Sequence, residues 1–136
     1  MVIFGQKIGT NMSTKSQIEN TIKKILALNN KIRFVAIISD TGKIISCQLN
    51  PDKHSLLTKS REEKFCRDII KRKMMRQEFD NNLGKVRYVN VERENMSQIV
   101  TYVNSKSIFV TIEPEITTIT KSHIISKIKK ISSNLK

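Results

Sequence analysis

The sequence is poor in several residue types that carry chemistry. Its 136 residues include no Trp, two His and four Gly, and aromatic residues make up 5% of the chain. Neither His54 nor His123 has a second ligand at the spacing of a zinc site, and the glycines form no phosphate-binding loop. So few aromatic side chains offer little surface for stacking nucleic-acid bases. We therefore expect no catalytic residue, no metal, no cofactor and no enzymatic activity.

Long hydrophobic runs are also lacking. No apolar stretch approaches the ~18–20 residues that a membrane-spanning helix needs, and the first residues do not have the charged and apolar regions of a signal peptide. Cys47 and Cys66 form no Cys-x-x-Cys pair, and each lies in an apolar stretch. These features predict a cytoplasmic protein with two reduced, packed thiols, and they do not favour contact with a membrane.

Positive charge is what the sequence has in excess. Lys and Arg number 25 against 12 Asp and Glu, which gives a formal net charge of +13. Such a balance favours contact with nucleic acid or with an acidic protein. The basic residues are dense between residues 59 and 76. Those we single out for contact with a partner or with phosphate are Lys64, Arg67, Lys71, Arg72, Lys73 and Arg76. A solvated helix face, partly neutralised by Glu63 and Asp68, is the alternative interpretation.

Hydrophobic periodicity predicts three helices and five strands. Apolar residues recur at helical spacing in three segments, and short β-branched runs are separated by polar turns. The predicted helices are 14–29, about 56–82 and 121–134. The predicted strands are 34–38, 43–49, 85–91, 98–103 and 107–112. The order α-β-β-α-β-β-β-α predicts an α+β fold, with a central five-stranded antiparallel sheet and helices on its faces.

Length predicts a single domain, because domains typically contain ~100–200 residues. Residues 1–12 show no clear periodicity, and we interpret them as a flexible lead-in. Residues 13–136 then form the one α+β domain.

Two segments resemble a known family. FVAIISDTGKIIS resembles the first hairpin of roadblock-type (dynein light chain 7-like) domains, and LGKVRYVNVERENMSQIVTYVNSKSIFVTIEP resembles their three-strand meander. Profilin-like domains are related to this family, so the resemblance, which covers roughly residues 14–134, implies a roadblock/profilin-like fold. The segment MMRQEFDNNLGKVRYVNV is also similar to a small, uncharacterised group of archaeal proteins.

The resemblance also implies a function. Roadblock-type domains are non-enzymatic platforms that bind partner proteins, small GTPases among them. We therefore expect a protein-interaction or regulatory module that forms a homodimer or binds an acidic or GTPase-type partner through an open sheet edge and the second helix. That helix departs from the family pattern, because it is basic where small and aliphatic residues are usual. The alternative is a nucleic-acid-associated protein that holds backbone phosphates with this helix.

Overall fold

The structure is a computed structural model, which describes the backbone of residues 2–135 and the side chains of residues 14–135. Its helices are α1 (Val2–Leu26), α2 (Lys59–Gln77), α3 (Asp80–Leu83) and α4 (Thr118–Ser132). Its strands are β1 (Ile32–Ile38), β2 (Ile44–Leu49), β3 (Val89–Glu92), β4 (Ser97–Val103) and β5 (Lys106–Ile112). The predicted α+β class and element order are confirmed, with the short α3 as an addition.

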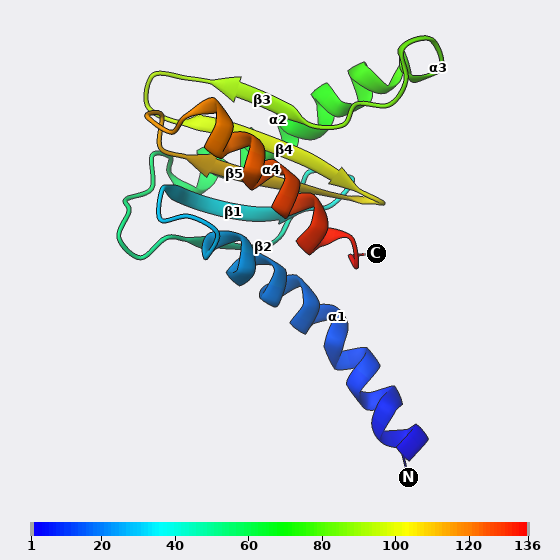
Figure 1. Cartoon of the computed structure of the whole chain (residues 1–136). Coiled ribbons are helices and arrows are strands. Elements are labelled where there is room, and N and C mark those ends of the chain that lie inside the picture. Colours follow the sequence, from blue (N-terminus) through cyan, green and yellow to red (C-terminus); the bar gives the residue numbers. More distant parts are fainter. Residues whose placement is uncertain (1, 136) are drawn as a thin grey trace.

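The five strands form one antiparallel sheet in the order β2-β1-β5-β4-β3. The central strands β1 and β5 are buried along most of their length. Helices cover both faces of these strands, which explains why their sequences are nearly continuous apolar runs. The sheet ends in two edge strands, β2 and β3, and Figure 1 shows β3 on the side away from α1.

Helices α1 and α4 lie on one face of the sheet, and α2 lies on the other (Figure 1). On the first face, Ile22 of α1 and Ile128 of α4 belong to a core cluster with aliphatic residues of β1, β4 and β5. On the second face, Cys66 and Ile69 of α2 pack with Phe34 and Phe109. This second cluster is smaller, so α2 leaves parts of its face uncovered.

Helix α1 begins earlier than predicted. It runs from Val2 to Leu26, through the segment that we interpreted as a lead-in. Figure 1 shows the N-terminal half of α1 extending away from the sheet. A helix segment with no sheet beneath it has no need of an apolar stripe, which is why periodicity did not reveal it. The division into a lead-in and a domain at 13–136 stays a prediction.

Helix α2 is shorter at both ends than predicted. The Thr58 hydroxyl accepts a hydrogen bond from the Arg61 amide at 3.2 Å and caps the helix start. The sequence predicted that Phe79 and Leu83 would extend the apolar stripe, and this was wrong, because they are 55% and 82% exposed. The cause is visible in Figure 1, where α3 lies beyond the end of the sheet.

The two cysteines have different surroundings. Both are free thiols, but Cys66 is buried on the face of α2 that packs on the sheet, whereas Cys47 is exposed on the edge strand β2. The prediction that both are packed was therefore wrong for Cys47. Burial raises the pKa of the Cys66 thiol to about 12, and burial together with Glu62 also raises the pKa of Cys47.

This difference predicts a stepwise reaction with an aromatic disulfide reagent. In the folded protein we expect only Cys47 to react, and Cys66 to react only after denaturant is added, since the thiolate is the reactive form. Absorbance of the released thiol measures both steps. A Cys47→Ser variant is the control and should show no reaction until it unfolds. Two thiols reacting at the same rate in the folded protein would contradict the burial of Cys66.

Candidate functional site

A groove runs along one flank of α2, between this helix and strands β3 and β4. It consists of two hollows of about 220 and 310 Å³ that share Arg76 and Tyr102 in their linings. Valines of β3 and β4 and Ile69 of α2 line the first hollow. Five cations surround the two hollows, and we call this feature the basic groove: Arg72, Lys73, Arg76, Lys85 and Arg93.

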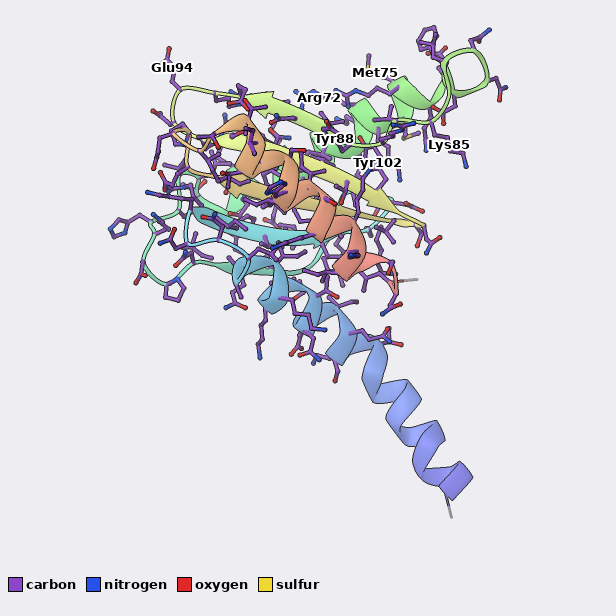
Figure 2. All side chains as sticks on the ribbon, in the orientation of Figure 1. Arg72, Met75, Lys85, Tyr88, Glu94 and Tyr102 are labelled. Atoms are coloured by element: carbon purple, nitrogen blue, oxygen red, sulfur yellow. The ribbon has the colours of Figure 1, made fainter. Side chains whose placement is uncertain are left out.

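Separate elements supply the cations. Arg72 and Arg76 lie one turn apart on α2, so their side chains share a flank of the helix. Lys85 comes from the segment between α3 and β3, and Arg93 follows directly after β3. Figure 2 shows Arg72, Lys85 and Tyr102 at the same end of the molecule. The antiparallel pairing of β3 with β4 is what brings these parts of the chain together.

Tyr102 lies at the junction of the two hollows. Its hydroxyl is buried, and the side chain of Arg76 lies beside it. Burial raises the pKa of this hydroxyl, and the nearby Arg76 partly offsets the rise. The Lys73 ammonium lies 5.1 Å from the centre of the ring, within range of a cation–π contact. The Tyr102 side chain therefore lies next to two cations of α2, Lys73 and Arg76.

Lys73 points inward rather than toward solvent. Its residue is only 9% exposed, and its Nζ lies 3.7 Å from Oδ1 of Asp40 in the β1–β2 turn. The spacing explains this position, because Lys73 follows Ile69 by four residues and Ile70 by three. The side chain thus connects α2 to the hairpin while its charge lines the groove.

The other three predicted contact residues lie outside the groove. Lys64 donates a hydrogen bond to Asp68 at 2.9 Å, and Lys71 lies 3.9 Å from the same carboxylate. The hydrogen bond from Lys64 lowers the pKa of Asp68. The backbone of Arg67 lies against Gly42 of the hairpin, on the far side of α2 from β3. The six predicted residues therefore divide into an inner set of three and an outer set of three.

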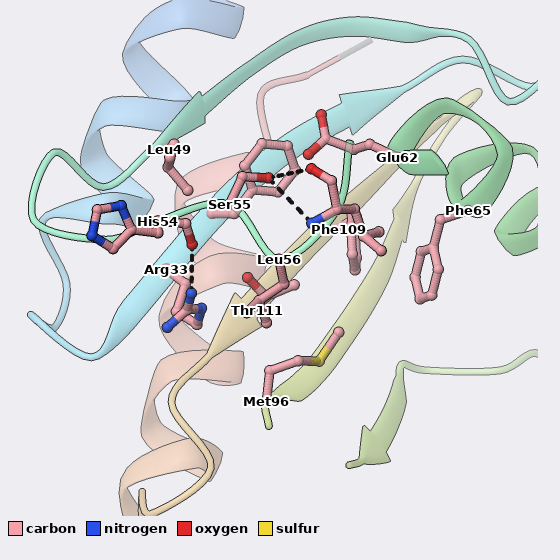
Figure 3. A pocket seen from close by; sticks show the side chains of 12 residues that line it. Arg33, Leu49, His54, Ser55, Leu56, Glu62, Phe65, Met96, Phe109 and Thr111 are labelled. Atoms are coloured by element: carbon pink, nitrogen blue, oxygen red, sulfur yellow. Dashed lines mark hydrogen bonds between the residues drawn. The ribbon is translucent and has the colours of Figure 1, made fainter. Parts of the chain in front are cut away.

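A second, apolar pocket lies at the N-terminal end of α2 (Figure 3). Its volume is about 50 Å³, and aromatic side chains of β1, β5 and α2 together with Met96 line it. Arg33 donates a hydrogen bond to the His54 carbonyl at 2.6 Å, and Ser55 donates one to the Leu57 carbonyl at 2.7 Å. These bonds hold the loop that forms the rim, where Leu56 is 54% exposed. The pocket has room for an apolar side chain of a partner.

Sequence reasoning missed Lys85, Arg93 and Tyr102. Each lies in a different segment, and none stands in a pattern that marks it as part of a site. Only the register of β3 on β4, in which Val89 is opposite Val100, places them beside α2. Among the described residues there is no cluster of three metal-binding side chains. No helix in the described part of the chain is long and apolar enough to cross a membrane.

The fold is that of roadblock and profilin domains, as comparison with solved structures shows. The gliding protein MglB of Thermus thermophilus superposes with a TM-score of 0.74 at 7% identity, over 88% of each chain. A Roadblock/LC7 domain from Streptomyces avermitilis gives 0.63 at 12% identity, over 82% of this chain and 91% of the other. Profilin II of Acanthamoeba castellanii gives 0.54 at 11% identity, over 82% and 93%.

The sequence itself matches one family. The profile of the family of unknown function DUF6659 matches residues 12–135, so the chain belongs to this family. No curated protein matches the sequence.

Proposed function

We propose that the chain is a cytoplasmic, archaeal-type regulatory module without enzymatic activity, which self-associates and binds an acidic or GTPase-type partner protein. The observation that carries this proposal is the open outer edge of β3 beside the exposed flank of α2. The roadblock-like fold supports it, and one structure of MglB with this fold is described as a tetrameric arrangement.

Strand β3 is the part of the sheet best suited to pairing. It bonds to β4 on one side only and stands last in the sheet order, so among the described residues no strand pairs with its other side. An open edge presents backbone N–H and C=O groups to another strand. Two copies related by a twofold axis would offer each other the same edge, which is the common geometry of a homodimer.

The flank of α2 beside β3 supplies apolar surface next to this edge. Met75 is 68% exposed and lies on the outward side of α2, three residues after Arg72 and four after Lys71. Phe79, just past the end of α2, is 55% exposed. Large apolar side chains beside an open strand are typical of an interface. The neighbouring arginines of two copies repel each other, and salt screens that repulsion.

A pair of methionine variants tests the proposal. Met75→Lys should weaken self-association by ~10-fold or more, because a lysine charge is costly to bury in an interface. Met74→Lys is the matched control. Met74 is 64% exposed and shares the opposite flank with Arg67 and Lys71, so this variant should stay within about twofold of the parent chain.

Sedimentation equilibrium measures the dissociation constants, and circular dichroism verifies that both variants fold. Equal effects of the two substitutions, or no self-association of the parent chain, would contradict the proposed interface.

A further inference from the structure

We propose that the basic groove binds an extended acidic segment of the partner, with carboxylates at alternate positions. This inference rests on the proposed function, because it names the chemistry of the partner that the same surface takes. Two observations support it: the course of the groove along β4 and the spacing of its arginines.

The groove follows strand β4 over several residues. Its lining extends from Gln98 to Tyr102 on this strand, which corresponds to ~13 Å at ~3.3 Å per residue. Val89, Val91 and Val100 give it an apolar floor. An extended peptide fills such a shape and places every second side chain on the floor. A compact phosphate group would leave most of the groove empty.

The arginine spacing matches an extended acidic segment. Arg72 and Arg76 are four residues apart on α2, which is ~6 Å along the helix axis. Side chains at alternate positions of an extended chain are ~6.6 Å apart and point the same way. Each guanidinium group can therefore donate two hydrogen bonds to one carboxylate, which is the bidentate geometry that arginine favours.

The remaining lining residues fit the same occupant. Lys85 and Arg93 extend the positive charge toward the two ends of the groove, and Asp80 at one end is the acidic residue of the described lining. The ring of Tyr102 lies in the lining of both hollows, where it adds to the apolar part of the groove. Tyr102 is a single aromatic side chain, which favours a peptide over stacked bases.

The experiment measures binding of a short fluorescent peptide of alternating Glu and Val by anisotropy, with the full chain at low salt. We expect saturable binding that weakens as salt is added. A peptide of the same composition with its Glu residues in one block should bind at least ~3-fold more weakly, because bidentate contacts depend on carboxylate spacing.

Two double variants locate the site. Arg72→Glu with Arg76→Glu should reduce peptide affinity by ~10-fold or more, since both carboxylates then meet like charges. Arg67→Glu with Lys71→Glu makes the same change in net charge on the outer flank of the same helix. This control should stay within about twofold, and melting temperatures verify the folding of both proteins.

Other outcomes overturn the inference. Equal losses of peptide affinity in the two double variants would show that binding depends on the overall positive charge and not on the groove. A short RNA duplex that binds more tightly than the peptide, and loses affinity only when Arg72 and Arg76 are changed, would show that the groove binds phosphates. A chain that self-associates but ignores the peptide refutes the acidic occupant and leaves the proposed self-association intact. A chain that binds the peptide in the groove but stays monomeric supports the occupant and refutes self-association.

Discussion

Gly42→Ala is expected to destabilise the protein by ~2–6 kcal/mol. Gly42 has a φ of +86°, which L residues rarely adopt, and a Cβ at this position would lie 2.6 Å from the Cα of Arg67. The turn cannot move away easily, because the Gly42 amide donates to the Ser39 carbonyl at 3.0 Å and the Ser39 amide donates to the Lys43 carbonyl at 2.8 Å. The cost thus combines backbone strain with a clash against the backbone of α2.

Gly84→Ala is the matched control for this prediction. Gly84 has a similar φ of +85°, but among the described residues no atom beyond its chain neighbours lies within 4 Å of its added Cβ. Its replacement should cost only the backbone strain, ~1–3 kcal/mol. Urea unfolding of both variants measures the difference. Equal losses of stability would show that the β1–β2 turn does not pack on α2, and would remove the basis for placing Arg67 on the hairpin side.

Ile128→Ala is expected to lower the free energy of unfolding by ~2–5 kcal/mol. Ile128 is fully buried and belongs to the core cluster that α1 and α4 form with the sheet. Removing its side-chain carbons loses apolar burial and leaves a cavity between α4 and the strands. The cavity adds to the cost, since close-packed interiors relax only in part.

Ile119→Ala provides the comparison on the same helix. Ile119 is 72% exposed in the first turn of α4, so its truncation should change stability by no more than ~0.5 kcal/mol. Thermal or urea unfolding of the two variants measures both effects. A small effect at Ile128 would contradict the packing of α4 on the sheet.

The fold could be predicted from the sequence where local signals and tertiary packing agree. Strands β1 and β2 lie within two residues of their predicted ranges, because their β-branched runs flank a turn that requires Gly42. The predicted end of helix α2 was wrong because the helix passes the end of the sheet there. Phe79 and Leu83 continue an apolar pattern that no strand covers, and the pattern alone does not reveal where the sheet stops.

The site could be predicted only in part. The density of basic residues indicated that α2 is part of the site, but it did not indicate which flank of α2 lines the basic groove. The structure places β3 and the β1–β2 hairpin on opposite sides of α2, and this arrangement separates Arg72 from Arg67. Arg93 and Tyr102 reach the groove through strand register, which is a long-range property that local patterns do not encode.

The central claim is that the chain works through protein contacts rather than by holding nucleic acid. Light scattering coupled to size-exclusion chromatography tests it most directly, at ~50 and ~200 mM salt and with or without a short RNA, because phosphate contacts weaken steeply over that range. We predict the mass of a dimer at both salt concentrations and no change when RNA is added. A monomer whose elution shifts with RNA only at low salt would contradict the account and assign the basic residues to phosphate binding.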